Sequence, residues 1–328
     1  MRVLVKGAGV AGLAVAHELA RRGAEVTVAE CRPAIGGNAS WLAGGMLAPW
    51  CERESAEEAV VALGQGAADW WNAILPGHVR WAGTLVVAHP RDAAELERFS
   101  QRTDNHRRLT QEEITELEPD LAGRFRQGLF FAREAHLDPR RAMAALADKL
   151  SAIGITFLFD AEEGTLPTLD SIVDCTGIAA RALSLRGVRG EMLILRTRDV
   201  ALARPVRLLH PRYPVYVVPR ADHHFMVGAT MIESDNDGPI TARSAMELLN
   251  TAYALHPAFG EAEIVETGAA LRPAYPDNLP RVSALGGTVT VNGFYRHGFL
   301  LAPAMATQAA ELILTETVHE ADRQRRSA

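Results

Sequence analysis

The first thirty residues constrain the fold more than any other stretch of the chain. A short apolar strand is predicted over residues 3–5, and it runs into the turn Gly7-Ala8-Gly9-Val10-Ala11-Gly12. Apolar residues then recur at helical spacing as far as Gly23, and a second apolar strand ends on Glu30. This order of strand, glycine turn, helix, strand and acid is the β-α-β unit that binds dinucleotides.

Each part of that unit has a physical purpose. Gly7 is expected to make the tight turn, Gly9 to let the backbone approach a pyrophosphate, and Gly12 to let helix and strand pack closely. The exposed N–H groups at the helix start attract phosphates. Glu30 lies 23 residues after Gly7, where a carboxylate accepts both ribose hydroxyls and thereby favours FAD or NAD over NADP. The predicted cofactor contacts are Gly7, Gly9, Val10, Ala11, Gly12 and Glu30.

Composition narrows the class of protein. The chain has 328 residues, 48% of them hydrophobic and 23% charged, which suits about two domains sharing a sizeable core. A net charge of −6 without clustered Lys and Arg argues against nucleic acid as the main partner. The sequence has no run of 18 apolar residues, so no membrane span is expected. The first strand begins within two residues of Met1, which leaves no room for a signal peptide and predicts a cytoplasmic protein.

The cysteines and histidines do not indicate a metal site. Cys31, Cys51 and Cys175 are odd in number and lack metal-ligand spacing, so reduced thiols are expected. Cys31 directly follows Glu30 and either lines the adenosine pocket or is a small buried apolar residue. His223 and His224 fall in a predicted hairpin turn, and a metal pair there would need a carboxylate or cysteine partner at ligand spacing, which the sequence lacks.

A glycine-rich loop after Glu30 carries the first family resemblance. It ends in Ser40-Trp41-Leu42-Ala43-Gly44-Gly45-Met46-Leu47-Ala48-Pro49. This S-x-x-x-G-G-M-L-x-P pattern resembles glycine oxidase, the ThiO branch of the D-amino-acid oxidase superfamily. The resemblance implies that small residues let backbone amides close over the flavin diphosphate and ring. The implied cofactor contacts are Cys31, Ala39, Ser40, Gly44, Gly45 and Met46.

The middle of the chain alternates helices and short strands. A helix is predicted over 56–75, a strand over 78–88 and a polar helix over 92–101. A capping box from Thr110 to Glu113 opens the next helix, and Asp138 followed by Pro139 opens another that ends near Gly154. A strand is predicted over 155–159. Residues 171–177 form a second flavoprotein signature, a buried strand that ends in Gly177 beside the cofactor.

Mainly β-strands are predicted over residues 189–230, and a helix follows from Thr241 to about Leu255. The fold class predicted is α/β, with a GR2-type FAD-binding Rossmann-like domain and a smaller α+β substrate domain built on an antiparallel sheet. The FAD domain is expected to be discontinuous, over 1–75, 130–186 and 268–328. Residues 76–129 and 187–267 form the predicted substrate domain, whose sheet lies over the flavin.

Two motifs near the C-terminus resemble the family's substrate-binding elements. Gly268-Ala-Ala-Leu-Arg272-Pro273, followed by Asp277 and Pro280, resembles a motif whose arginine grips the substrate carboxylate. A guanidinium suits that role because it binds a carboxylate bidentately and stays charged in a closed site. Arg296 matches a second family arginine, and the helix after it is expected to direct its positive end toward the reduced flavin ring. The implied cofactor contacts here are Arg296, His297, Gly298, Phe299 and Leu300.

Two further positions rest on motif alignment alone. Tyr216 matches the tyrosine of a Y-x-V-P-R motif, whose hydroxyl would be a second donor to the substrate carboxylate. Met231 matches a methionine that crowds the pocket and favours small amines. A core tyrosine and a gap-filling methionine are the alternatives. With Arg272 and Arg296 they complete the predicted substrate site.

The resemblance spans nearly the whole chain and implies an FAD-dependent oxidase of glycine and other small primary or secondary amines. The implied reaction transfers a hydride from Cα to flavin N5, with no side-chain acid or base required. O2 reoxidises the flavin to give H2O2, and the imine hydrolyses to glyoxylate and ammonia. The family would supply iminoacetate for the thiazole of thiamine, so thiazole-synthesis proteins are expected partners and a homotetramer the expected assembly.

Other interpretations share part of this evidence. A D-amino-acid oxidase or dehydrogenase and a sarcosine-oxidase-like enzyme have the same fold. The sarcosine relatives bind flavin covalently through a C-terminal cysteine, and this chain has no cysteine after Cys175, which favours non-covalent FAD. An NAD-dependent dehydrogenase shares only the first fingerprint. A non-catalytic flavin-binding partner of a biosynthetic complex is the alternative outside enzymes.

Overall fold

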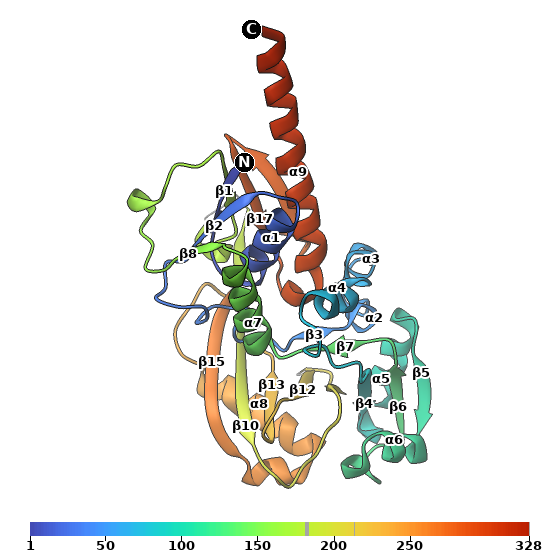
Figure 1. Ribbon diagram of the computed structural model, residues 1–328. Coiled ribbons are helices and arrows are strands. Elements are labelled where there is room, and N and C mark those ends of the chain that lie inside the picture. The colour runs from blue at the N-terminus through green and yellow to red at the C-terminus, as the bar shows by residue number, and fades with distance from the viewer. Residues whose placement is uncertain (181–183, 213, 328) are drawn as a thin grey trace.

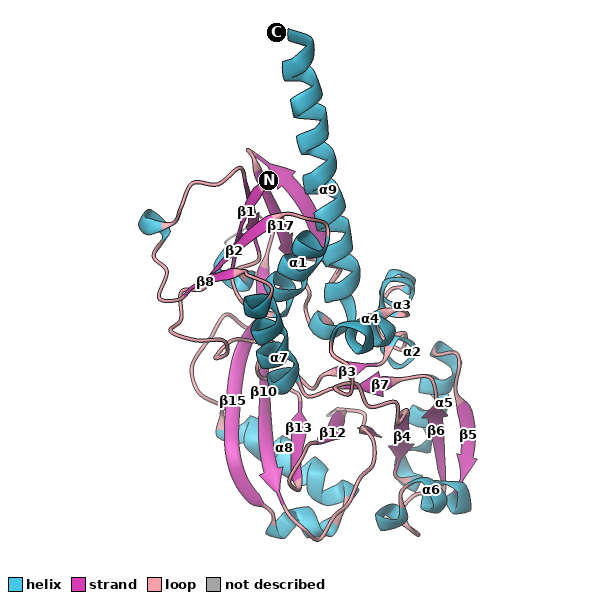
Figure 2. Cartoon of the chain, viewed as in Figure 1, coloured by secondary structure: helices cyan, strands magenta, loops and turns pink. Residues whose placement is uncertain are grey.

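Two β-sheets, one above the other in Figure 1, organise the molecule. The computed structural model describes the backbone of all residues except 181–183, 213 and 328, and the side chains of all except these and 316–327. Figure 2 shows helices packed on both sheets. The architecture is therefore mixed α/β, as predicted.

The upper sheet has six strands in the order β16-β17-β9-β1-β2-β8. The pairs from β17 to β8 are parallel, whereas β16 is antiparallel to β17. The strands are β1 (Arg2–Lys6), β2 (Glu25–Ala29), β8 (Thr156–Leu158), β9 (Ser171–Asp174), β16 (Arg281–Leu285) and β17 (Thr288–Asn292). This sheet contains the predicted β-α-β unit.

Helices cover the upper sheet with small and apolar residues. The helices are α1 (Val10–Arg21), α7 (Pro139–Ala152) and α9 (Gly298–Ser327). Two further helices, α3 (Glu58–Gly64) and α4 (Ala67–Ile74), pack on α9, whereas α2 (Pro49–Glu52) joins a core on the lower sheet. Helix α1 contacts α9 closely because alanines line both helices in one buried core. Asp138 caps α7 by accepting from the N–H groups of Arg140 and Arg141, as its sequence predicts.

The lower sheet has nine strands and is mostly antiparallel. Eight run in the order β14-β10-β13-β12-β11-β4-β6-β5, and β15 pairs with β10. The strands are β4 (Thr84–Ala88), β5 (Arg107–Thr110), β6 (Gln127–Phe131), β10 (Arg186–Arg196), β11 (Val206–Leu209), β12 (Val215–Pro219), β13 (His224–Gly228), β14 (Ile232–Glu233) and β15 (Glu263–Ala274). One face packs on α8 (Ala242–Leu255), whose Leu248 and Ala252 join the core of that face.

The remaining elements are short. A two-stranded sheet joins β3 (Met46–Leu47) to β7 (Ala135–His136), and two helices, α5 (Ala93–Arg102) and α6 (Gln111–Leu117), flank β5. The capping box of Thr110 and Glu113 is present at the start of α6. Single 3₁₀ turns lie at Pro90–Asp92, Pro119–Leu121, Glu163–Thr165, Gly177–Ala180 and Pro257–Glu261.

Three local predictions differ from the structure. The helix expected over 56–75 is two helices, α3 and α4, because the chain breaks at Gln65 and Gly66. The strand expected over 78–88 begins only at Thr84, and of the preceding residues only Arg80 forms an isolated bridge, with His136. Strand β16 was not predicted. The division into two domains remains a prediction, and its boundaries at 129/130 and 267/268 fall inside β6 and β15.

The long C-terminal helix is the one apolar helix of spanning length in the described part of the chain. Its window Gly298–Thr315 has a mean hydropathy of 1.3, and 56% of that window is buried inside the protein. Since its alanines and leucines pack against α1 and α4, the apolar character of α9 is that of a core helix.

Candidate active site

Two helix N-termini meet at the centre of the upper half. A Cβ placed on Gly298, the first residue of α9, would lie 3.2 Å from Cγ1 of Val10, the first residue of α1. Gly9, the N-cap of α1, has no side chain that could occupy the N–H groups of the first turn. The positive ends of two helices therefore converge where the sequence predicts a negatively charged cofactor.

The glycine turn leaves no room for side chains. Gly7 has a φ of +93°, and a Cβ there would lie 2.7 Å from the carbonyl oxygen of Cys175. A Cβ on Gly12 would lie 1.8 Å from the carbonyl oxygen of Gly7. Only glycine fits at either position, which is the close packing that the fingerprint requires.

Glu30 lies buried at the end of β2 and faces this turn. Its Oε2 accepts from the Ala8 N–H at 2.9 Å and its Oε1 from the Arg32 N–H at 3.1 Å. The neighbouring Cys31 is exposed, so its interpretation as a buried apolar residue is wrong. Its Sγ lies 3.4 Å from Glu30 Oε1, next to the predicted ribose position, and its role in the adenosine pocket remains a prediction.

The loop predicted to cover the flavin is held from both sides. Ser40 Oγ accepts from the Val10 N–H at 3.2 Å, which ties the loop to the start of α1. Half-buried Ala39 precedes it. Gly45 has a φ of +75°, and a Cβ there would lie 2.2 Å from the carbonyl oxygen of Leu137. Met46 continues into β3.

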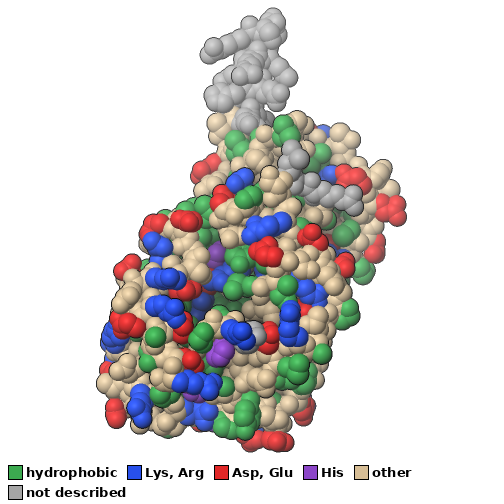
Figure 3. Space-filling view, turned by 180° about the vertical axis from the view of Figure 1, so that it is seen from behind, with side chains coloured by type: hydrophobic (Ala, Val, Ile, Leu, Met, Phe, Trp, Pro, Cys, Tyr) green, Lys and Arg blue, Asp and Glu red, His purple; other side chains and the backbone are tan. Residues whose placement is uncertain are grey.

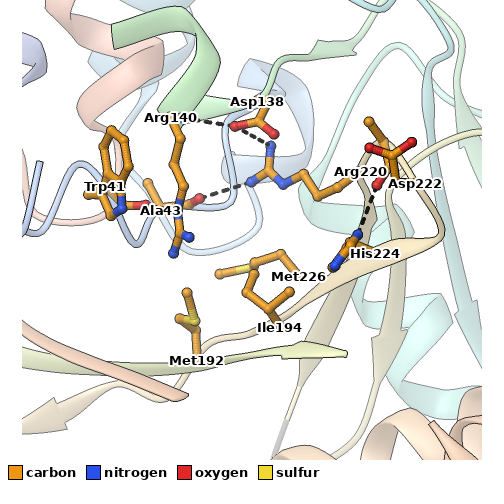
Figure 4. A pocket seen from close by; sticks show the side chains of 11 residues that line it. Trp41, Ala43, Asp138, Arg140, Met192, Ile194, Arg220, Asp222, His224 and Met226 are labelled. Carbon is orange, nitrogen blue, oxygen red and sulfur yellow. Dashed lines mark hydrogen bonds and ion pairs between the residues drawn. The ribbon is translucent and has the colours of Figure 1, made fainter. Parts of the chain in front are cut away.

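Arg220, which follows β12, ties the same loop to the lower sheet (Figure 4). Its Nη2 donates to the carbonyl oxygens of Ala43 and Gly44, at 3.1 and 2.9 Å. Its Nη1 donates to the Leu137 carbonyl oxygen at 2.8 Å. Burial lowers the pKa of Arg220 to about 10, so it remains a cation at neutral pH. One guanidinium thus fixes the backbone of the loop that includes Gly44.

Gly177 ends the second signature as predicted, beside the end of β17. It has a φ of +63°, and its carbonyl oxygen accepts from Asn292 Nδ2 at 2.8 Å. The ends of β9 and β17 are therefore joined at the edge of the sheet where ligands bind in open α/β folds.

Arg272 lies flat against the backbone of Gly190 on the neighbouring strand. A Cβ on Gly190 would lie 2.2 Å from Nη2 and 2.3 Å from Cζ of Arg272. Nη1 donates to the Thr230 carbonyl oxygen at 3.0 Å. Burial lowers the pKa of Arg272, whereas the nearby Tyr216 acts in the opposite direction. The guanidinium is therefore fixed in a restricted space close to a tyrosine.

Tyr216 lies between the lower sheet and the flavin loop. A Cβ on Gly44 would lie 2.9 Å from the Cε2 of its ring. Its side chain also packs against a small cluster that includes Met192 and Met226. The structure thus brings Tyr216 together with Arg272 and the loop, although it tests neither a carboxylate role nor a core role for the tyrosine.

Arg296 and Met231 meet at the exposed side of this site. Arg296 Nη1 lies 3.2 Å from Met231 Sδ, and the Tyr295 hydroxyl lies 3.4 Å from the same sulfur. Met231 is 47% exposed, which places it at an opening rather than in a core. The interpretation of Met231 as a buried gap-filling residue is therefore wrong, and its effect on substrate size stays a prediction.

A buried carboxylate, Glu52, was not predicted and holds Arg296 in place. Its Oε2 accepts from Arg296 Nε at 2.7 Å and from Arg296 Nη2, and it lies 2.9 Å from His297 Nε2. Its Oε1 accepts from Arg207 Nη2. Burial alone would raise the pKa of Glu52, but the two guanidinium groups more than offset it and hold that pKa well below its usual range.

His297 is a buried, neutral neighbour of this carboxylate. Burial lowers its pKa despite the bond to Glu52. Its Nδ1 has no hydrogen-bond partner among the described residues. Helix α9 starts directly after His297, and in its first turn the Phe299 carbonyl oxygen accepts from Trp71 Nε1 at 2.9 Å and the side chain of Leu300 is buried. Trp71 is fully buried in the core beside the start of α9.

A separate pocket of about 250 Å³ lies beside the flavin loop (Figure 4). It is lined by Trp41, Ala43, Asp138, Arg140, Met192, Ile194, Arg220, Ala221, Asp222, His224 and Met226. Figure 3 shows a hollow with basic and apolar side chains around it on the rear face. None of the described residues lining the pocket is one of the four predicted substrate residues. Nor does the described part of the chain hold a group of three or more His, Cys, Asp or Glu suited to a metal ion.

The sequence contained weak signals for the residues that were missed. Arg220 belongs to the Y-x-V-P-R motif, which was used only for its tyrosine. Glu52 is a charged residue immediately after an apolar loop, and Arg207 alternates with apolar residues in a strand. Gly190 interrupts the apolar β10. None of these signals says which side chain each residue contacts, because the partners are distant in the sequence.

The residues present fit FAD. The glycine turn excludes side chains, the acid faces the turn, and two helix N-termini converge on it. The small-residue loop connects that turn to Tyr216 and Arg272. Together these features form a continuous path from the predicted ribose position to the predicted substrate position.

Comparison with known proteins agrees with this geometry. Residues 2–312 match a family model described as FAD dependent oxidoreductase, DAO. The chain is 63% identical over 318 residues to a protein of Rhizobium etli provisionally named thiamine biosynthesis oxidoreductase ThiO, covering 96% of this chain and 97% of that one. It is 27% identical to the glycine oxidase of Pseudomonas aeruginosa, covering 95% and 94%. The solved glycine oxidase of Bacillus cereus superposes with a TM-score of 0.82 at 23% identity, covering 96% and 95%.

Proposed function

The chain belongs to the DAO family of FAD-dependent oxidoreductases, and on that premise we propose that it is an oxidase of glycine and similar small amines. The products would be the imine, which hydrolyses to glyoxylate and ammonia, and H2O2 from O2. The names of the Rhizobium etli and Pseudomonas aeruginosa relatives support this choice of substrate and a supply of imine to thiamine synthesis.

The observation that carries the proposal is the fixed guanidinium of Arg272. It lies against Gly190, is held by the Thr230 carbonyl oxygen and has Tyr216 close by. A bidentate ion pair from a fixed guanidinium orients a carboxylate in one plane. The Tyr216 hydroxyl would donate to the same carboxylate. A small amino acid bound in this way has its Cα held in one position relative to Arg272 and Tyr216.

The remaining residues suit the binding of the cofactor and the stabilisation of negative charge on it. FAD, when bound, supplies the two-electron acceptor for the substrate Cα–H bond. Glu30 would hold the ribose, and Gly7, Gly9 and Gly12 would let the backbone approach the diphosphate. The N-terminus of α9 would stabilise negative charge near it. No side-chain acid or base is required, and we nominate none.

The test is an anaerobic spectrum of the FAD-loaded protein before and after adding glycine, sarcosine and D-alanine in turn. The proposal expects the oxidised-flavin absorption to disappear fastest with glycine and H2O2 to form when O2 is admitted. Fastest loss with D-alanine would instead indicate a D-amino-acid oxidase or dehydrogenase. A yellow protein that none of the three reduces would be a non-catalytic flavin-binding protein.

We propose the partners and the assembly from the relatives and the family resemblance. The name of the Rhizobium etli relative supports partners in thiamine biosynthesis, and the family resemblance supports a homotetramer. Size-exclusion chromatography with light scattering would measure the assembly directly.

A further inference from the structure

The guanidinium groups of Arg272 and Arg296 reach two consecutive residues. Arg272 Nη1 donates to the Thr230 carbonyl oxygen, and Arg296 Nη1 contacts Met231 Sδ. Because Thr230 and Met231 are adjacent residues and Arg296 adds to burial in lowering the pKa of Arg272, the two cations lie close enough to act on one small ligand. A site with two free guanidinium forks would prefer a ligand that has two carboxylates.

The two forks differ in what already occupies them. Arg296 directs Nε and Nη2 at Glu52 Oε2, and Nη2 also lies 3.1 Å from Ser55 Oγ. Nη1 is in contact with Met231 Sδ. Nε and Nη2 are the paired donors that could bind a ligand carboxylate bidentately, and both already donate to a protein carboxylate.

Glu52 is itself held firmly in this position. It is buried, it ends the short helix α2, and Arg207 of the lower sheet holds its other oxygen. His297 Nε2 contacts the same Oε2 as Arg296 does. The carboxylate is thus fixed by one group of the lower sheet and by two groups of the segment before α9, and it cannot follow a ligand into the site.

We propose that Glu52 is a positioning residue that occupies the fork of Arg296 and so restricts the site to ligands with a single carboxylate. Arg272 is then the one clamp for the ligand carboxylate, and Arg296 shapes the entrance beside Met231. This inference deepens the proposed function, on which it rests for the identity of the ligand site. It makes amino acids without a second acidic group the substrate class.

The test uses two unreactive acids of one shape. Malonate has two carboxylates, and 3-methylbutanoate has an uncharged isopropyl group of similar shape in place of the second one. Their dissociation constants are measured by calorimetry with the FAD-loaded protein and its Glu52→Gln variant. We expect Glu52→Gln to change the ratio of the two constants at least tenfold in favour of malonate, because the freed fork of Arg296 then receives the second carboxylate.

Three controls isolate the cause. Glu52→Asp keeps the charge and should keep the wild-type ratio. Glu118→Gln disrupts another buried ion pair, Glu118 with Arg204 at 2.7 Å, that contacts none of the site residues, and should also keep the ratio. Arg272→Ala should abolish binding of both acids, and malonate that still binds to it would overturn the placement of the ligand.

An unchanged ratio in Glu52→Gln would overturn the inference, and so would an equal gain for both acids, since that indicates extra space rather than a freed fork. If the single variant does not fold, Glu52→Gln combined with Arg207→Gln removes both buried charges and gives the same expectation. Neither acid is oxidised, so this result is independent of glycine turnover. If Glu52→Gln changes the ratio as expected while the wild-type protein leaves glycine unreacted, only the proposed function is refuted.

Discussion

Gly190 offers the sharpest test of the substrate clamp. In Gly190→Ala, the new Cβ would lie 2.2 Å from Arg272 Nη2 and 2.3 Å from its Cζ. Carbon atoms in contact normally lie about 3.5 Å apart or more, so the guanidinium must move by more than about 1 Å. That movement also breaks its bond to the Thr230 carbonyl oxygen, now 3.0 Å long.

The size of the expected loss in kcat/KM for glycine follows from this displacement. Misplacing a positioning group by about 1 Å costs on the order of 10²-fold in rate, or about 2.7 kcal/mol. Because the proposed role has Arg272 bind the carboxylate before and during the reaction, most of the loss should appear as a higher KM for glycine. The assay is peroxide release at several glycine concentrations, with FAD content and the melting temperature measured on the same sample.

A matched control separates the clash from the mere addition of a methyl group. Gly66→Ala adds the same Cβ where no atom lies within 4 Å, and the Gly66 φ of −88° suits alanine, so KM should not change. A Gly190→Ala enzyme with the wild-type KM for glycine would show that Arg272 does not bind the substrate carboxylate from this position.

Three other changes give distinct results. Arg272→Ala should raise the glycine KM steeply, and Arg272→Lys should recover little of the loss because an ammonium lacks the planar fork. Steady-state kinetics measure both effects, and an unchanged kcat/KM in Arg272→Ala would refute the clamp. Arg220→Met should weaken FAD binding about tenfold or more, because the charge-assisted bonds of Arg220 to the flavin loop are each worth about 1.5–3 kcal/mol. Flavin fluorescence titration measures the Kd for FAD, and an unchanged Kd would contradict this role of Arg220. Burial raises the pKa of Glu134 to about 7, above the unfolded value near 4.3, so the free energy of unfolding should fall by roughly 3 kcal/mol as pH rises from about 4.3 through 7. In Glu134→Gln, melting curves at pH 5 and pH 8 should differ less than in the wild type.

Local patterns in the sequence were enough to predict the elements whose signals are local. The glycine turn before α1, the N-cap Asp138 and the capping box of Thr110 each involve residues within a few positions of one another, and the structure confirms all three. The substrate arginines were found differently, through a family resemblance. Periodicity alone would have left Arg272 as one polar residue in an edge strand.

The contacts that hold the site together were not predictable in the same way. Glu52 binds Arg296 and Arg207, and Arg220 binds the flavin loop, across separations of more than 150 residues. A single sequence does not say which oppositely charged groups will meet. The helix expected over 56–75 was wrong for a local reason instead, because the chain breaks at Gln65 and Gly66 between α3 and α4.

The meeting of Gly298 with Val10 has a consequence for how the protein matures. One side of the cofactor cradle forms at the start of the chain and the other near its end, and neither side can be completed by its own neighbours. A nascent chain that lacks α9 therefore lacks half of the cradle. From the predicted cofactor site we therefore expect uptake of FAD to await the docking of this last helix, after which the bound cofactor would oppose separation of the two ends by mass action. The yellow colour of a purified sample would therefore report that the first and last segments have assembled.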